Sequence, residues 1–295
     1  MRVAITGTTG QLGGRLFSLR KAPQAEGLTL LECARDLMDL AVPESIPSAL
    51  DFLKPDVVIS CAAYTAVDAA EDERERAFAI NGAAPGILGE ACAARGIGVV
   101  HISTDYVFDG LGKRPYLPGD ETGPTGAYGE SKLAGEMALT AALPGASIVR
   151  VGWLYDRDGK NFLNTMLRLA SERQQLNVVD DQLGCPTHVG DFAEDLLDWV
   201  RLGATDPAVT KGIHHYGHSG ITSWHGFASA IFEVKAPHVE VLPVSTAAFP
   251  TKAKRPGYSK LDEGGFFQRL GRAPISWKEA MDRCLHAKFD APSPA

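Results

Sequence analysis

In the first 150 residues, short continuous apolar runs alternate with helical patterns. Of all the features of the sequence, this alternation most restricts the folds that the chain can adopt. Continuous β-branched runs suit strands buried on both faces, and the stretches between them repeat apolar residues at helical period. Such an order predicts a doubly wound α/β fold, a parallel sheet whose ligands bind at the carboxyl ends of the strands. The predicted strands are 2–6, 28–34, 56–63, 97–104 and 146–152.

A glycine-rich loop directly follows the first predicted strand and opens the first predicted helix. Gly7, Gly10 and Gly13 are three residues apart in the stretch TGTTGQLG. Glycines there permit a tight turn and let the backbone approach a pyrophosphate, whose negative charge then faces a helix N-terminus. The stretch lacks the Gly-Lys-Ser/Thr of a nucleotide triphosphate loop, so it predicts a dinucleotide on a Rossmann-type sheet.

The choice between NAD and NADP depends on the end of the second strand. An acidic side chain there would bind the ribose 2′-hydroxyl of NAD, whereas an arginine would accept the 2′-phosphate of NADP. Both Glu32 and Arg35 are present. We predict NADPH with Arg35 at its phosphate, and NADH remains open with Glu32 at the ribose.

Beyond residue 151 the alternation weakens, which indicates a smaller, discontinuous substrate-binding domain. Helical patterns there are separated by Gly- and Pro-containing loops, and they cover 161–172, 191–203 and 224–234. The predicted dinucleotide-binding domain comprises 1–154 and 176–208, and the predicted nucleotide-sugar domain 155–175 and 209–290. Residues 289–295 are expected to fray.

Tyr128 and Lys132 lie four residues apart at the start of a predicted helix, so they share one of its faces. An isolated phenol titrates at about pH 10 and is a poor acid-base catalyst at neutral pH. A neighbouring ammonium favours the phenolate, so we expect it to lower the pKa of Tyr128 toward the working range. The spacing alone is common in surface helices, and it gains meaning from the glycine loop before it.

Charge and cysteine content exclude several other classes of protein. The net charge of −7 argues against a nucleic-acid or anionic-membrane surface, and no apolar stretch approaches the length of a membrane span. The five cysteines are scattered and never spaced as zinc ligands, so we predict a cytoplasmic protein without a metal site. His214, His215 and His218 lack a carboxylate or cysteine partner, and neighbours on a strand point to opposite faces.

With these features placed, the chain resembles the extended short-chain dehydrogenase/reductase family from TGTTGQLG to RPGYSKLD, nearly its full length. The glycine loop and the Tyr-x-x-x-Lys pair belong to the whole superfamily. STDYVFDG, DQLGCPT and RPGYSKLD are more specific, and they resemble the members that act on a nucleotide-linked 4-keto sugar. The resemblance implies NADPH-dependent reduction of dTDP-4-dehydro-L-rhamnose to dTDP-L-rhamnose, in the synthesis of cell-surface polysaccharide.

The resemblance also implies roles for individual residues. Tyr128 would donate a proton to O4 of the sugar, Thr104 would share that oxygen, and Lys132 would hold the nicotinamide ribose. With the loop and Arg35, the residues expected on the cofactor are Gly7, Gly10, Gln11, Leu12, Gly13, Arg35, Asp39, Leu40, Ala62, Ala63, Thr65, Tyr128 and Lys132. The residues expected on the substrate are Thr104, Asp105, Tyr106, Trp153 and Arg255. The basic stretch with Arg255 (Lys252, Lys254, Lys260) could equally be a solvated loop.

The sequence departs from the family pattern in a few places. SCAA at 60–63 stands where many members have Asn-Ala-Ala, and Gly152 stands where a serine or threonine is usual. Some members bind Mg²⁺ through glutamates at a dimer contact, but the first helix here carries Gly14 and Arg15, so Mg²⁺ is not expected. A homodimer stays open.

Two alternatives to the reductase remain. One is an NADP-binding regulatory subunit without turnover, as known among similar proteins. The other is a reductase or epimerase of another nucleotide-linked keto-sugar, because epimerases and dehydratases use the same tyrosine and lysine. The intact set of Thr104, Tyr128 and Lys132 favours an enzyme over a regulatory subunit.

Overall fold

The computed structural model describes residues 1–286, so the expected fraying of 289–295 lies outside the described residues. At its centre is a six-stranded sheet in the order β10-β5-β4-β3-β1-β2, with every pair parallel. This arrangement confirms the predicted Rossmann-type, doubly wound α/β fold. Its strands are β1 (Arg2–Thr6), β2 (Thr29–Cys33), β3 (Val57–Ser60), β4 (Gly98–Thr104), β5 (Ser147–Val151) and β10 (Gly212–His215).

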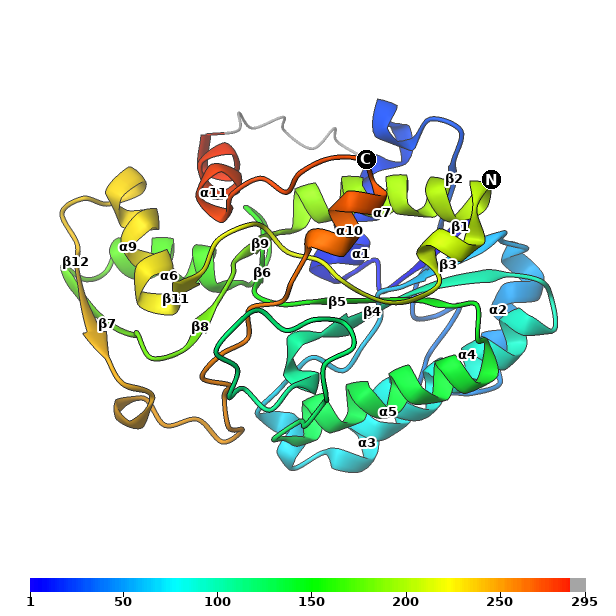
Figure 1. Ribbon diagram of the computed structural model, residues 1–295, viewed down its shortest axis with the longest axis horizontal. Coiled ribbons are helices and arrows are strands. Elements are labelled where there is room, and N and C mark those ends of the chain that lie inside the picture. Colours follow the sequence, from blue (N-terminus) through cyan, green and yellow to red (C-terminus); the bar gives the residue numbers. More distant parts are fainter. Residues whose placement is uncertain (287–295) are drawn as a thin grey trace.

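Helices cover both faces of this sheet (Figure 1). One face carries α1 (Gln11–Ser18) and α7 (Val189–Thr205), and the other carries α2 (Ser45–Leu53), α4 (Ala84–Ala93) and α5 (Ala127–Ala142). The short α3 (Arg74–Phe78) leads into α4 through a π-helical segment, Ala79–Ala83. Within residues 1–286, none of the helices combines the length and apolarity that a membrane crossing needs.

The apolar run of β1 explains this two-sided covering. Val3 and Ile5 pack into the cluster beneath α1 and α7, whereas Ala4 belongs to the cluster beneath α2, α4 and α5. Successive side chains of a strand point to opposite faces, so a strand buried on both must be apolar throughout. The fold therefore follows directly from the pattern of the sequence.

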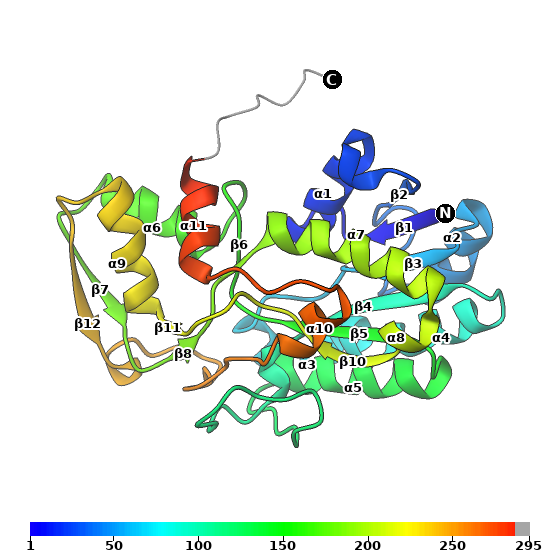
Figure 2. The ribbon, with the colours of Figure 1, turned by 45° about the horizontal axis from the view of Figure 1, so that its top comes forward.

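A smaller lobe stands at the carboxyl ends of the strands, on the left of Figures 1 and 2. It has its own core, in which Leu163, Val178, Phe227 and Trp277 are buried together. Its strands are β6 (Leu154–Tyr155), β7 (Gln175–Val179), β8 (Leu183–Gly184), β9 (Thr187–His188), β11 (Thr222–Ser223) and β12 (Glu240–Val244). The remaining helices of the second half are α6 (Phe162–Ala170), α8 (Pro207–Thr210), α9 (Trp224–Lys235), α10 (Gly264–Arg269) and α11 (Trp277–His286).

The division into two domains stays a prediction, and two strands pair across its expected boundaries. β10, from the segment assigned to the sugar domain, extends the large sheet beside β5. β7, almost wholly within the segment assigned to the dinucleotide domain, pairs with β12 in the small lobe. Pairing between strands so distant in sequence depends on tertiary packing. Local sequence periodicity therefore does not predict it.

Candidate active site

A cleft of about 540 Å³ opens between the carboxyl edge of the sheet and the small lobe. All the residues predicted to bind the cofactor line it, from the glycine loop to Lys132. The predicted catalytic and substrate residues line it as well, with the exception of Arg255. The structure thus brings side chains from positions 7 to 153 to one place, and their individual roles remain predictions.

The glycine loop has the shape that a pyrophosphate requires. Gly7 has φ +69°, a conformation that other residues rarely adopt, and its carbonyl accepts the Gly10 N–H at 2.9 Å. A Cβ on Gly13 would lie 2.3 Å from that same carbonyl oxygen, so the helix packs against the turn only with glycine there. The free N–H groups of the first turn of α1 then face the cleft, and the loop fits a dinucleotide.

At the end of the cleft where the adenosine is expected, Arg35 and Glu32 have different surroundings. Arg35 lines the cleft with 68% of its side chain exposed, and its Nε donates to Asp39 Oδ2 at 3.0 Å. Glu32 accepts a hydrogen bond from Thr8 Oγ1 at 2.9 Å and does not line the cleft in the described part of the chain. The Arg35 guanidinium and its partner Asp39 therefore line the cleft wall, whereas the Glu32 carboxylate does not.

Tyr128 lies at the bottom of the cleft, beside Thr104. The expectation of a lowered phenol pKa is wrong for this structure, because burial raises the pKa of Tyr128 above its ordinary value and the Thr104 side chain only partly offsets this. The Lys132 ammonium is directed elsewhere, toward His101 and the carbonyl of Ile102. Tyr128 is consequently a neutral phenol, a species that can donate a proton.

Asp105 explains one departure from the family pattern. Its side chain is 2% exposed, and its Oδ1 accepts a hydrogen bond from Thr104 Oγ1 at 3.0 Å. Burial raises the pKa of Asp105 to about 6. A Cβ on Gly152 would lie 2.4 Å from Asp105 Oδ2, so the carboxyl group occupies the space that a serine or threonine side chain would need.

Trp153 links the sheet to the small lobe. Its backbone has φ +53°, an uncommon conformation for a bulky residue and one that is often found at functional sites. Its ring stacks on Trp224 with centroids 3.5 Å apart, and its Nε1 donates to Ser259 Oγ at 3.0 Å. A Cβ on Gly184 would lie 2.5 Å from the ring, so this glycine makes room for it. Sequence reasoning missed Trp224, because nothing local to it indicates the stack.

Arg255 lies outside the cleft lining but next to it. Its Nη2 donates to Asp68 Oδ2 at 2.7 Å, and its charge acts on Tyr106, which lines the cleft: burial raises the pKa of Tyr106 to about 12, and Arg255 partly offsets this. Asp68 accepts the Ala253 N–H at 2.9 Å as well, and Lys252 pairs with Asp72. These contacts hold the basic loop of the small lobe against the sheet domain, with Arg255 at the rim of the cleft.

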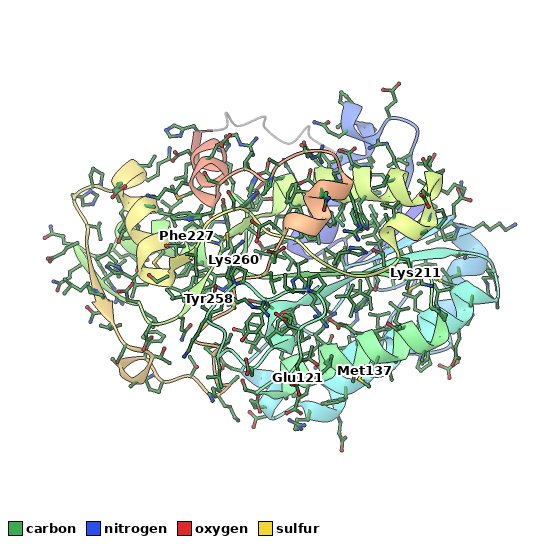
Figure 3. All side chains as sticks on the ribbon, viewed as in Figure 1. Glu121, Met137, Lys211, Phe227, Tyr258 and Lys260 are labelled. Carbon is green, nitrogen blue, oxygen red and sulfur yellow. The ribbon has the colours of Figure 1, made fainter. Side chains whose placement is uncertain are left out.

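Three of the other groups that the sequence left open, Lys260, His214 and His215, have structural partners. Lys260, labelled between the lobe and the sheet domain in Figure 3, is 5% exposed and pairs with Glu263 at 2.5 Å. His214 and His215 bond backbone carbonyls through Nε2 and Nδ1, respectively. These three side chains serve packing within the fold.

Among residues 1–286, one cluster has the spacing of a metal site: Asp156, His188 and Cys284, with ligand atoms within 4.8 Å of one another. His188 already has anionic partners, since its Nε2 lies 3.7 Å from Asp156 and its Nδ1 3.1 Å from Asp191. Burial alone would lower the pKa of His188, but the two carboxylates raise it to about 11. His188 Nδ1 also accepts the Asp191 N–H at 3.4 Å, so both ring nitrogens already have partners within the protein.

Sequence reasoning also missed Asn81, which lies in the π-helical segment before α4. Its side chain is buried and forms two hydrogen bonds with the backbone of Tyr64. Oδ1 accepts from the Tyr64 N–H at 2.8 Å, and Nδ2 donates to the Tyr64 carbonyl at 2.9 Å. The same amide donates to Ser131 Oγ of α5 at 3.1 Å. Asn81 therefore ties the loop after β3, which lines the cleft, to the helix that carries Tyr128.

Comparison with known proteins gives a consistent result along the whole chain. The family described as "RmlD substrate binding domain" matches residues 1–289. The dTDP-4-dehydrorhamnose reductase of Sinorhizobium fredii is 41% identical over 292 residues, covering 97% of each chain. That of Mycobacterium tuberculosis is 41% identical over 299 residues, covering 99% of this chain and 95% of the relative. The solved dTDP-4-dehydrorhamnose reductase of Bacillus anthracis, in complex with NADP, matches with a TM-score of 0.88 at 35% identity, covering 97% of this chain and 99% of that one.

Proposed function

The chain belongs to the RmlD substrate binding domain family, a branch of the extended short-chain dehydrogenases/reductases, and on that premise we propose that it reduces dTDP-4-dehydro-L-rhamnose to dTDP-L-rhamnose with NADPH. The observation that carries the proposal is a single cleft holding the glycine loop together with Thr104, Tyr128 and Lys132. Its place is the synthesis of nucleotide sugars for cell-surface polysaccharide.

The chemistry at the sugar follows from the state of Tyr128. The nicotinamide, when bound, supplies the hydride, and the protein supplies placement and electrostatics. Negative charge develops on O4 as the carbonyl is reduced, so a proton or a strong hydrogen bond must reach that oxygen. Tyr128 is a protonated phenol at neutral pH, since burial raises its pKa further above 7, so it can donate to that oxygen, which Thr104 would share.

Lys132 serves the cofactor side of the site. An ammonium has three N–H donors, and two of them are used by His101 Nε2 at 3.1 Å and the Ile102 carbonyl at 2.7 Å. The third remains for a ribose hydroxyl, since Lys132 lines the cleft. Arg35, on the wall at the adenosine end, suits the 2′-phosphate that distinguishes NADPH from NADH.

The small lobe would hold the rest of the substrate. Trp153 presents its ring between the cleft and the lobe, next to the carboxyl edge of the sheet. Arg255 is close enough to the cleft for its charge to act on the pKa of Tyr106, and a guanidinium matches a diphosphate in charge and geometry. Asp68 would hold Arg255 in place until the diphosphate arrives.

The stoichiometry of the reaction tests the proposal. A reductase consumes one NADPH per sugar reduced, so loss of NADPH absorbance should match the dTDP-L-rhamnose that accumulates. An epimerase or dehydratase returns its nicotinamide to the starting state in each cycle, and a regulatory subunit binds NADPH without consuming it. Sugar conversion without net NADPH loss, or an untouched keto-sugar, contradicts the proposal.

The cellular setting is part of the same proposal. We infer a cytoplasmic enzyme, since all five cysteines are free thiols, which suits a reducing compartment. A homodimer, which the family resemblance left open, is part of the same proposal. Sedimentation equilibrium of the full chain distinguishes a dimer from a monomer.

A further inference from the structure

A buried histidine stands behind the catalytic lysine. His101 is 1% exposed on β4, and its Nε2 lies 3.1 Å from Lys132 Nζ. Its Nδ1 lies 3.2 Å from the hydroxyl of Ser60, its directly opposed neighbour on β3. The three side chains form a line from the cleft into the sheet, Lys132–His101–Ser60, and neither His101 nor Ser60 lines the cleft in the described part of the chain.

The direction of these hydrogen bonds is fixed by chemistry. An ammonium can only donate, so His101 Nε2 must be the unprotonated nitrogen that accepts from Lys132. The ring proton therefore sits on Nδ1 and is donated to Ser60 Oγ, which selects the tautomer. Burial lowers the pKa of His101 well below its ordinary value, and Lys132 lowers it further, so the ring stays neutral.

We propose that His101, oriented by Ser60, is a positioning residue that holds Lys132 in its charged form and aims its remaining N–H at the cofactor ribose. This inference rests on the proposed reductase function for its kinetic readout, but not for its binding readout. The neutral Nε2 of His101 accepts a hydrogen bond from the ammonium and so stabilises its charged form. A buried carboxylate in the same place would instead form an ion pair with the ammonium.

The other groups around Lys132 leave this role to His101. Glu136 lies one turn further along α5, but its carboxylate is taken by Arg150 at 2.6 and 2.9 Å and by Ser103. The thiol of Cys61, at the end of β3, is neutral because burial raises its pKa to about 12. Tyr128 is a neutral phenol.

The net effect of this environment is a lysine that titrates near physiological pH. Burial lowers the pKa of Lys132 to about 8, and Glu136 only partly offsets this. Burial raises the pKa of the Tyr128 phenol above its ordinary value, so we expect the first alkaline loss of activity to come from Lys132. A substitution that removes a hydrogen-bond acceptor of the Lys132 ammonium should therefore shift the pH at which this activity is lost.

The experiment compares His101→Leu with His101→Gln. Leucine removes one of the two acceptors and leaves only the Ile102 carbonyl, so the ammonium is less stable and the alkaline limb of kcat/KM should move about 1–2 pH units lower. The rate deficit should then be largest at pH 8 and smallest at pH 6. Glutamine places an amide oxygen where Nε2 was, and it should restore the limb to within about half a pH unit of the wild type.

His214→Leu is the matched control. His214 is also buried on the same sheet, in β10, but it bonds only backbone carbonyls far from Lys132. It should lose a comparable amount of stability and leave the pH profile where it was. If His101→Leu does not fold, Ser60→Ala replaces it, since losing the group that selects the tautomer should shift the limb in the same direction by less.

A second readout needs no turnover. NADPH affinity without sugar, measured by fluorescence titration, should fall above about pH 8 in the wild type, where Lys132 loses its charge. In His101→Leu the fall should begin at lower pH. A failed reductase assay with this shift present contradicts the proposed function alone. Active variants whose limb and NADPH titration both match the wild type overturn the role of His101.

Discussion

The two sides of the cleft are built from contacts of very different range. On the proposed cofactor side, the glycine turn is made within seven residues, where Gly7 and Gly13 meet directly. On the sugar side, Trp153 reaches Ser259 across 106 positions and Arg255 reaches Asp68 across 187. The glycine loop is thus a local feature of the chain, whereas the contacts of Trp153 and Arg255 form only when the whole protein is folded.

This difference predicts which variants separate the two halves. Changes on the cofactor side should alter NADPH affinity alone, and changes on the sugar side should alter the KM of the sugar alone. The groups between them should affect the rate or the stability without favouring either ligand.

The largest effect is expected for Tyr128→Phe, which removes the proton donor between the halves. General acid catalysis contributes roughly 10²–10⁴-fold, so kcat should fall by that factor while NADPH affinity is kept. Tyr116→Phe makes the same change at a phenol that bonds Asp109, and it should keep its rate. Tyr128→Phe activity within about threefold of the wild type contradicts the assignment.

Asp105→Asn should change stability, because the buried carboxylate is costly when charged. The folded pKa of about 6 lies above the ordinary value of 3.8, so this group favours the folded state below about pH 4 and loses that contribution as pH rises through 6. At pH 8 the variant should be more stable by up to about 3 kcal/mol, and at pH 4 it should show no gain. Urea unfolding at both pH values measures this.

Asp109→Asn is the control with the opposite sign. Hydrogen bonds from Tyr116 and the Leu111 N–H hold the pKa of Asp109 below its ordinary value, so its contribution is present at pH 8 and lost in acid. The asparagine variant should therefore be less stable than the wild type at pH 8. Equal effects of the two substitutions would show that burial does not set the behaviour of Asp105.

Arg35→Ala tests whether the cofactor side recognises the 2′-phosphate. A charge-assisted contact of this kind is worth roughly 1.5–3 kcal/mol, so NADPH affinity should fall about tenfold or more while NADH affinity is spared. Glu32→Ala is the counterpart and should affect neither cofactor strongly, because its carboxylate bonds Thr8. If Arg35→Ala lowers the affinity for NADPH and NADH equally, Arg35 is only a surface charge. Glu32 then becomes the better candidate for binding the adenosine ribose.

The smallest effect is expected for Arg255→Ala on the sugar side. Loss of ground-state binding raises KM without lowering kcat, so the KM of the nucleotide sugar should rise about three- to tenfold with NADPH affinity unchanged. Lys254→Ala, an exposed neighbour in the same loop, should have no effect on either ligand. A change in NADPH affinity in Arg255→Ala would break the separation between the two sides.

The same contrast of range explains how much the sequence could predict. The parallel sheet, the glycine loop and the Tyr128–Lys132 helix follow from local period and spacing. The pairing of β7 with β12 could not be predicted, because residues 175–179 find their partners at 240–244 by packing. The direction of the Tyr128 pKa could not be predicted either, since it depends on burial and on where the Lys132 ammonium points.

Positioning residues were the hardest to find in the sequence. His101, Asp68 and Trp224 contact Lys132, Arg255 and Trp153, which the sequence had pointed to, whereas Asn81 bonds Tyr64 and Ser131, which it had not. Their partners lie on other elements, 17 positions away for Asn81 and 31 for His101. Only the folded structure brings such pairs together.

The central claim is that this cleft transfers a hydride from NADPH to C4 of the keto-sugar. The direct measurement is a turnover of dTDP-4-dehydro-L-rhamnose with NADPH deuterated at C4 of the nicotinamide, once on each face, followed by NMR of the sugar product. The account predicts that one of the two labelled cofactors places deuterium at C4 of dTDP-L-rhamnose, with one label for each NADPH oxidised. Product without deuterium from either cofactor would contradict it.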